Sequence, residues 1–187
     1  MINLGYLDIR TFLEAIMSLP QPEQLLEKMA QQLQNQYMKN DEDIVMVGIH
    51  SGGAWVAQEL HKRLELSSEL GSLDISFYRD DFTKNGLNPQ VKGSMLPSIE
   101  NKTVILVDDV IMSGRTIRAA MNELFDYGRP HKIVLACLLD TGKRELPIQA
   151  DVVGEVINLK AHERIKLNGP DPLVLSLASL ISKSGES

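Results

Sequence analysis

The spacing of apolar residues along the chain predicts four helices. Apolar residues recur at helical spacing in 22–38 and in 55–66, and 8–19 reads as a further helix before the break Pro20-Gln21-Pro22. A fourth helical pattern follows residues 112–116 and stops at Gly128-Arg129-Pro130, where Gly128 can cap the helix and Pro130 blocks its continuation.

Other segments change to strand-like patterns. Continuous apolar runs are typical of strands buried on both faces of a parallel sheet, and strict alternation is typical of a strand with one exposed face. The continuous runs lie at 44–49, 104–107 and 133–139, the alternating run at 73–78, and shorter candidates at 152–153 and 165–167. Strands that alternate with helices predict an α/β domain with a mostly parallel sheet, in which ligands bind beyond the carboxyl ends of the strands.

Composition narrows the class of protein. The chain has 187 residues, a length that predicts one domain, and a net charge of −6, which weighs against non-specific binding to nucleic acid. Its one cysteine, Cys137, lies inside an apolar run, so we expect a buried side chain, no intrachain disulfide and a cytoplasmic location. No apolar stretch is long enough to span a membrane, and the first residues lack the pattern of a secretion leader. Residues 80–101 show little periodicity, which leaves a binding lid and a surface insertion as equal alternatives.

The stretch VILVDDVIMSGRT, residues 104–116, places two adjacent carboxylates at the expected end of a buried strand. Ionised carboxylates are costly to bury without partners, so we expect Asp108 and Asp109 to face water, a cation or hydroxyl donors. Neighbouring carboxylates can accept hydrogen bonds from the paired hydroxyls of a ribose, and they can also lie near Mg²⁺.

A helix start follows the two aspartates directly. Free backbone N–H groups and the positive end of the helix dipole make such a start an anion site, and Ser113, Gly114 and Thr116 add hydroxyls and a close backbone approach. Together with the aspartates, this predicts a sugar-phosphate site, whereas the plain alternative is a helix capped by Ser113 after a solvated strand end. Neither the GxxxxGK[ST] loop nor the GxGxxG spacing occurs in the chain.

Residues 104–116 resemble the phosphoribosyl-pyrophosphate (PRPP) motif of type I phosphoribosyltransferases. Four further segments, 74–84, 91–93, 128–130 and 144–151, resemble the PyrR family of bacterial pyrimidine-operon attenuation proteins that are also uracil phosphoribosyltransferases. The resemblance covers roughly residues 44–167. It implies a type I phosphoribosyltransferase-like α/β fold, in which helices flank a mostly parallel sheet and a flexible loop and a small C-terminal hood complete the site. We expect a single domain over 1–187, with 1–43 as a helical N-terminal extension packed on it and about 150–178 as the hood.

The resemblance also implies an activity, a cofactor and residue roles. The activity is that of a pentosyltransferase, uracil + PRPP → UMP + pyrophosphate, with Mg²⁺ held through the pyrophosphate of PRPP and through Asp108 or Asp109. Leaving-group stabilisation matters most in such a displacement, and no catalytic triad is expected. Asp108, Asp109 and Arg79 are the catalytic candidates, and the two aspartates would bind the ribose hydroxyls. The 5′-phosphate is assigned to Met112, Ser113, Gly114, Arg115 and Thr116, the pyrophosphate to His50, Ser51, Gly52 and Gly53, loop closure to Asp80, Asp81, Lys84 and Lys92, and the base to Thr141 and Ile165.

Two segments depart from the family pattern. Many relatives have Lys-Thr-Arg-Gly where this chain has His50-Ser51-Gly52-Gly53, so the loop lacks its guanidinium unless Arg79 or Lys84 replaces it. The Asp-Arg-Gly that follows the third strand in relatives is Asp140-Thr141-Gly142 here, which weakens the assignment of a base or pyrophosphate contact.

A second hypothesis is an RNA-binding regulator of pyrimidine genes that responds to UMP or PRPP and has little or no turnover. Residues 1–43 carry three basic and seven acidic side chains, a poor surface for RNA. Residues 129–166 are richer in Lys and Arg, with Lys143 and Arg144 as the candidate RNA contacts, although a scattered basic face is more simply solvated surface. A transferase for another base also stays open, and a homodimer or higher homo-oligomer is expected because relatives form one.

Overall fold

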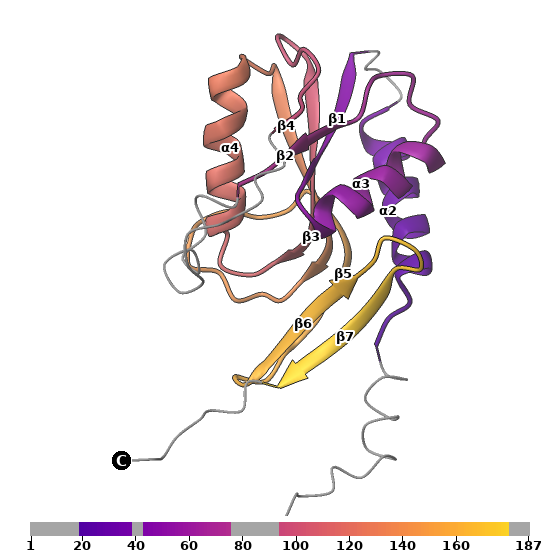
Figure 1. The fold of residues 1–187 in the computed structure, drawn as a ribbon, viewed down its shortest axis with the longest axis vertical. Helices are drawn as coiled ribbons and strands as arrows, with labels where there is room; N and C mark the ends of the chain where they lie inside the picture. Colours follow the sequence, from indigo (N-terminus) through magenta and orange to yellow (C-terminus); the bar gives the residue numbers. More distant parts are fainter. Residues whose placement is uncertain (1–18, 39–42, 76–93, 180–187) are drawn as a thin grey trace, which may run out of the picture.

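Five parallel strands form the central sheet of the part of the chain that the structure describes, which is residues 19–38, 43–75 and 94–179 of a computed structural model (Figure 1). The strands are β1 (Ile44–Ile49), β2 (Gly71–Leu73), β3 (Thr103–Ile111), β4 (Lys132–Asp140) and β5 (Val152–Val156). Their order in the sheet is β2-β1-β3-β4-β5. The connection from β1 places β2 on one side of β1, whereas the connection from β2 crosses back and places β3 on the other side. The order therefore reverses between β1 and β3, and a sheet of this kind has its ligand crevice beyond the carboxyl ends of those two strands.

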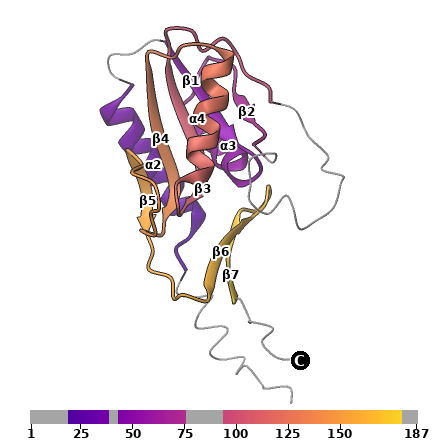
Figure 2. The same cartoon turned by 90° about the vertical axis from the view of Figure 1, so that its left-hand side faces the viewer.

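Helices cover both faces of the sheet. α2 (Pro22–Gln36) and α3 (Gly52–Arg63) lie on one face, and α4 (Arg115–Tyr127) lies on the other (Figures 1 and 2). Successive side chains of a strand point to opposite faces. Accordingly, Met46 and Ile105 pack in the core under α2 and α3, and Val47 and Leu106 pack in the core under α4. Burial on both faces explains why β1 and most of β3 consist of unbroken apolar runs.

A separate antiparallel pair, β6 (Glu163–Asn168) and β7 (Val174–Ser179), forms the β6–β7 hairpin (residues 163–179). The hairpin lies at the end of the sheet from which α4 starts (Figures 1 and 2). Its turn packs closely on α3, because a Cβ atom at Gly169 would lie 2.8 Å from Cε3 of the Trp55 ring. The hairpin and α3 are thus in direct contact at the carboxyl ends of the strands.

The predicted fold class is confirmed, and the elements within the described residues agree closely with the patterns that predicted them. Two elements differ from the prediction. β3 does not end at the aspartates but pairs with β4 as far as Ile111 opposite Asp140. The strand expected at 73–78 is instead β2, which ends at Leu73, and residues 76–78 are outside the described residues.

The expected domain organisation stays a prediction. β5 falls inside the range predicted for the hood but belongs to the central sheet. In the N-terminal extension, α2 is described and packs on β5, where the Nζ of Lys28 donates a hydrogen bond of 2.6 Å to the Gly154 carbonyl. The helix expected at 8–19 lies outside the described residues except for Leu19. None of the described helices is both long enough and apolar enough to cross a bilayer.

Candidate functional site

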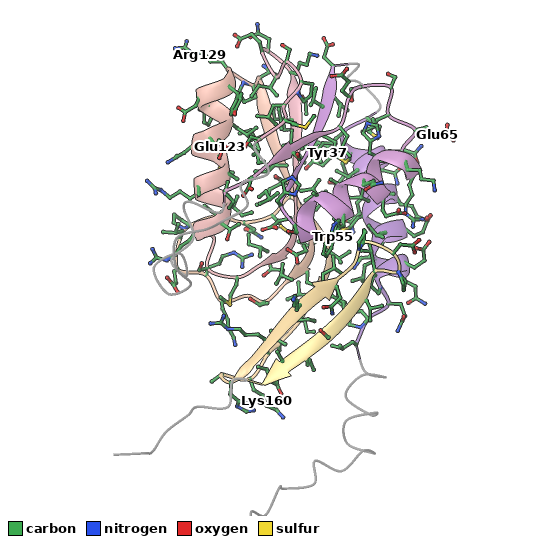
Figure 3. The ribbon with its side chains drawn as sticks, in the orientation of Figure 1. Tyr37, Trp55, Glu65, Glu123, Arg129 and Lys160 are labelled. Atoms are coloured by element: carbon green, nitrogen blue, oxygen red, sulfur yellow. The ribbon has the colours of Figure 1, made fainter. Side chains whose placement is uncertain are left out.

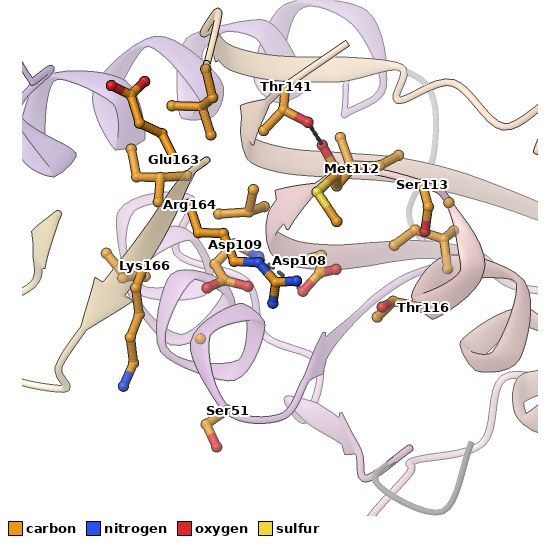
Figure 4. Close-up of a pocket in the computed structure, with 18 of the residues that line it drawn as sticks. Ser51, Asp108, Asp109, Met112, Ser113, Thr116, Thr141, Glu163, Arg164 and Lys166 are labelled. Carbon is orange, nitrogen blue, oxygen red and sulfur yellow. Dashed lines mark hydrogen bonds between the residues drawn. The ribbon is translucent and has the colours of Figure 1, made fainter. Parts of the chain in front are cut away.

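A pocket of about 470 Å³ opens where the order of the strands reverses. Its walls come from the end of β3, the starts of α3 and α4, and β6 of the hairpin (Figure 4). Predicted site residues that line it are Ser51, Gly52, Asp108, Asp109, Met112, Ser113, Gly114, Thr116, Thr141 and Ile165. The fold thus brings together segments that are more than a hundred residues apart in the sequence.

The two aspartates lie inside strand β3 and differ in exposure. Asp108 is only 3% exposed, and its Oδ1 accepts a hydrogen bond of 3.0 Å from the backbone N–H of Asp109. Asp109 is half-buried and faces the start of α3. Asp108 lines the pocket although it is largely buried, so the expectation that both carboxylates face water, a cation or hydroxyl donors stays a prediction.

The β1–α3 turn (residues 50–53) rests directly on these aspartates. A Cβ atom at Gly52 would lie 2.5 Å from Cγ of Asp109, and one at Gly53 would lie 2.5 Å from the Val107 carbonyl oxygen. Only glycine permits this approach, since real Cβ atoms are not found closer than about 3 Å to other heavy atoms. The backbone N–H of His50 donates to the Leu73 carbonyl at 2.8 Å, which fixes the turn to β2. His50 and Gly53 support the turn but do not line the pocket.

The α4 entry loop (residues 112–114) forms the opposite wall. Gly114 is the N-cap of α4 with φ of 89°, a left-handed conformation that other residues rarely adopt. Its cap has no side-chain hydrogen bond, so the alternative in which Ser113 is a conventional N-cap is wrong, although Ser113 Oγ accepts a bond of 3.3 Å from the N–H of Arg115. The Arg115 side chain does not line the pocket but pairs with Glu145 at 2.8 Å.

Both helix starts are electrostatically suited to anions. Neither α3 nor α4 has an acidic residue in its first turn. Each start therefore carries the positive end of its helix dipole without an acidic residue of its own first turn, and Asp109 lies against the start of α3. The arrangement can hold a ligand with hydroxyl groups at its centre and a phosphate at each end.

The roof of the pocket comes from Thr141, which directly follows β4, and from the hairpin. Thr141 is 4% exposed, and its Oγ1 donates a hydrogen bond of 3.3 Å to the Ile111 carbonyl (Figure 4). The pKa of Glu163 is lowered, first because its carboxylate accepts the backbone N–H of Lys160 at 2.9 Å. Ile165 lies between Arg164 and Lys166 on β6, and all three line the pocket.

Sequence reasoning did not assign nine of the lining residues to the site: Trp55, Val110, Ile111, Ile117, Leu159, Glu163, Arg164, Lys166 and Leu167. In Figure 4 the guanidinium of Arg164 extends from β6 toward the two aspartates. Among the described residues this guanidinium has no ion-pair partner. The sequence of β6 held a signal for Arg164 and Lys166, because charged and apolar residues alternate there and the two cations flank the predicted base contact Ile165.

Several residues that were predicted to bind substrate or RNA do not line the pocket or lie outside the described residues. Arg79, Asp80, Asp81, Lys84 and Lys92 lie outside the described residues. Lys143 donates to the Lys160 carbonyl at 3.1 Å, and Arg144 bonds to backbone and to Asp140. Both candidate RNA contacts thus have partners within the chain.

A metal ion would find few protein ligands here. Among the described residues no group of three or more His, Cys, Asp or Glu side chains could hold one. Asp108 and Asp109 nevertheless suit Mg²⁺, because this ion is commonly bound by one or two carboxylates, and substrate phosphates and water supply its other ligands.

Known proteins are similar to this chain in sequence and in fold. A family model described as "Phosphoribosyl transferase domain" matches residues 13–167. The bifunctional protein PyrR of Pseudomonas fluorescens is 55% identical over 166 residues, which is 88% of this chain and 99% of that protein. The bifunctional protein PyrR of Pseudomonas aeruginosa strain LESB58 is 55% identical over 170 residues, which is 90% of this chain and all of that protein.

Among solved structures, a hypoxanthine phosphoribosyltransferase from Staphylococcus aureus matches with a TM-score of 0.62 and 24% identity, covering 82% of this chain and 83% of that chain. A hypoxanthine-guanine phosphoribosyltransferase from Bacillus anthracis matches with a TM-score of 0.58 and 23% identity, covering 75% and 80%. At these identities the solved structures support the fold alone.

Proposed function

Because the chain belongs to the phosphoribosyl transferase family and, within it, to the PyrR proteins, we propose that it transfers a phosphoribosyl group from PRPP to uracil. The products are UMP and pyrophosphate. The observation that carries the proposal is the pair of β3 aspartates in one pocket between the starts of α3 and α4.

Each wall of the pocket has a role in this reaction. Asp108 and Asp109 accept hydrogen bonds from the ribose hydroxyls, and the amides at the start of α4 bind the 5′-phosphate. The β1–α3 turn binds pyrophosphate through backbone N–H groups, which replace the guanidinium that many relatives carry in this loop. The bond from the anomeric carbon to the pyrophosphate oxygen breaks, the bond to uracil N1 forms, and the proton of N1 leaves to solvent.

The chain contributes mainly position and electrostatics to this displacement. A transition state with positive charge on the sugar lies close to two carboxylates, one of them buried, where charge interactions are stronger than in water. Mg²⁺, when bound with PRPP, supplies positive charge to the departing pyrophosphate, and Asp108 and Asp109 are the residues that could add protein oxygens to it. The β6–β7 hairpin covers the base, and Thr141 and Ile165 lie on that side of the pocket.

The test is to incubate the protein with PRPP and Mg²⁺ and to offer uracil, hypoxanthine, guanine and orotate separately. We expect UMP from uracil and no nucleotide from the other three bases. Asp109→Asn should lose turnover, and Gln58→Ala, an exposed change on α3, should keep it. Turnover with a purine, or none with uracil, would refute the proposed specificity.

A second candidate function is an RNA-binding regulator, and the curated relatives carry the word "bifunctional" in their name. Binding of PRPP or UMP without any product would favour this function over the transferase. Binding to an RNA hairpin that weakens steeply with added salt and tightens with UMP would support it directly.

A further inference from the structure

The segment at residues 144–148, which we call the bracing segment, holds the α4 entry loop from outside the pocket. The guanidinium of Arg144 donates to three oxygens, from Nε to the Ile148 carbonyl at 2.7 Å, from Nη1 to the Met112 carbonyl at 2.9 Å and from Nη2 to Asp140 Oδ2 at 2.6 Å. The backbone N–H groups of Glu145 and Leu146 both donate to the Ser113 carbonyl, at 3.0 and 3.1 Å. Two consecutive carbonyls of the entry loop are therefore bound by the bracing segment.

The direction of these carbonyls fixes the direction of the amides in the loop. In a planar trans peptide the C=O of one residue and the N–H of the next point in opposite directions. The Met112 and Ser113 carbonyls point at the bracing segment, so the N–H groups of Ser113 and Gly114 point away from it. Ser113 and Gly114 line the pocket, and their N–H groups are thus directed to the side on which an anion would bind.

The brace is anchored on the rigid sheet. Asp140 is the last residue of β4, and its two carboxylate oxygens accept from Arg144 Nη2 and from the N–H of Gly142, the latter at 2.7 Å. The side chains of Arg144 and Asp140 are 21% and 13% exposed, so their ion pair is largely shielded from solvent. A planar guanidinium with a fixed carboxylate partner holds its remaining donors in one orientation, which a lysine cannot do.

We propose that Arg144 is a positioning residue for the 5′-phosphate. By holding the Met112 carbonyl outward, Arg144 keeps the entry loop in the orientation whose amides bind the phosphate and prevents a carbonyl from turning toward it. The inference rests on the proposed function, because that function places the 5′-phosphate at the start of α4. It assigns Arg144 to the substrate site rather than to an RNA surface.

The test compares two ligands that bind at different walls of the pocket. Ribose 5-phosphate probes the α4 entry loop and pyrophosphate probes the β1–α3 turn, and calorimetric titration measures both for the wild type and for Arg144→Ala, Arg144→Lys and Arg129→Ala. Arg129 is an exposed arginine at the end of the molecule opposite the hairpin (Figure 3), so its replacement is the matched control.

We expect Arg144→Ala to raise the Kd for ribose 5-phosphate about tenfold, as for the loss of one charge-assisted hydrogen bond, and to change the Kd for pyrophosphate by less than about twofold. Arg144→Lys, which keeps the charge but not the fork, should fall between Arg144→Ala and the wild type, and Arg129→Ala should match the wild type. In turnover, the KM for PRPP should rise more than the KM for uracil.

The outcomes separate the two claims. Wild-type affinity for ribose 5-phosphate in Arg144→Ala overturns the positioning role and leaves the proposed function intact. Equal losses for both ligands in the alanine and the lysine variants would show a general structural defect and overturn the role as well. A wild-type protein that binds neither PRPP nor ribose 5-phosphate overturns the proposed function and, with it, the inference.

Discussion

The close approach of Gly52 to Asp109 allows activity to be reduced while the fold is kept. In Gly52→Ala the new methyl group would lie closest to Asp109 Oδ2, 2.5 Å from Asp109 Cγ and 2.9 Å from Asp109 Cβ. To reach ordinary van der Waals contact at 3.4 Å, the carboxylate carbon must move by about 0.9 Å and the nearer oxygen Oδ2 by more. Asp109 is half-buried at the pocket, so its carboxylate can turn away from the methyl group, and the contact with Asp109 Cβ needs a backbone shift of about 0.5 Å to reach 3.4 Å.

The two effects of this change have different sizes. Moving Asp109 off its preferred rotamer costs about 0.5–1.5 kcal/mol of stability, and alanine recovers up to about 1 kcal/mol over glycine in a helix. The free energy of unfolding should therefore change by no more than about 1.5 kcal/mol. A catalytic group displaced by about 1 Å can lose a factor of about 100 in rate, equivalent to about 2.7 kcal/mol of activation free energy.

The assay pairs UMP formation with thermal unfolding. We expect kcat/KM to fall about 100-fold and Tm to stay within a few degrees of the wild type. Gly53→Ala is the contrast, because its methyl group would meet the Val107 carbonyl oxygen at 2.5 Å and the Asp108 Cα at 2.8 Å, and backbone atoms cannot turn away. That variant should lose both activity and stability. A Gly52→Ala protein with kcat/KM within threefold of the wild type would refute the placement of Asp109 at the reacting sugar.

Four further predictions address the site and its surroundings. Replacing both Asp108 and Asp109 with Asn should lower UMP formation by a factor of about 100 or more while cooperative unfolding is retained, and normal turnover would remove the aspartates from the ribose site. Burial, and next the charge of Asp108, raises the pKa of the Cys137 thiol well above its usual range, so a thiol reagent should react only after unfolding, and fast reaction of the native protein would contradict this. Because that pKa is higher in the folded than in the unfolded state, only the unfolded protein loses the thiol proton above roughly pH 8.5. The contribution of Cys137 to the free energy of unfolding is therefore complete below that pH and falls above it by about 1.4 kcal/mol per pH unit, which chemical denaturation of the wild type and of Cys137→Ala at several pH values measures. Gly169→Ala, whose methyl group would lie 2.8 Å from the Trp55 ring, should displace the hairpin, shift the emission of the only tryptophan and raise the KM for uracil, and an unchanged spectrum with an unchanged KM would speak against hairpin closure over the base.

The sheet could be predicted because its strands are buried on both faces. β1 is an unbroken apolar run, and the run in β3 is unbroken until the aspartates. The end of β3 could not be predicted in the same way, because its last residues are held by pairing with β4 as far as Asp140, a contact between distant segments. Local pattern therefore located the strand but stopped short of its true end.

The candidate site was predictable where its residues form one continuous motif. The aspartates and the α4 entry loop lie within thirteen residues, and the fold keeps them in one pocket. Trp55 and Arg164 could not be found in this way, since tertiary packing alone brings a helix face and a hairpin to the same place. For Arg144 the sequence was misleading, because it suggested a charge available to a partner molecule. In the structure the guanidinium donates to two backbone carbonyls and to Asp140.

The central claim is that the pocket holds a phosphoribosyl group between the β3 aspartates and the start of α4. A crystal structure of the protein with PRPP and Mg²⁺ tests it most directly. We predict the ribose hydroxyls within hydrogen-bond distance of Asp108 and Asp109, and the 5′-phosphate on the amides that begin at Ser113. PRPP bound with its ribose away from both aspartates, or with its 5′-phosphate at another wall of the pocket, would contradict the claim.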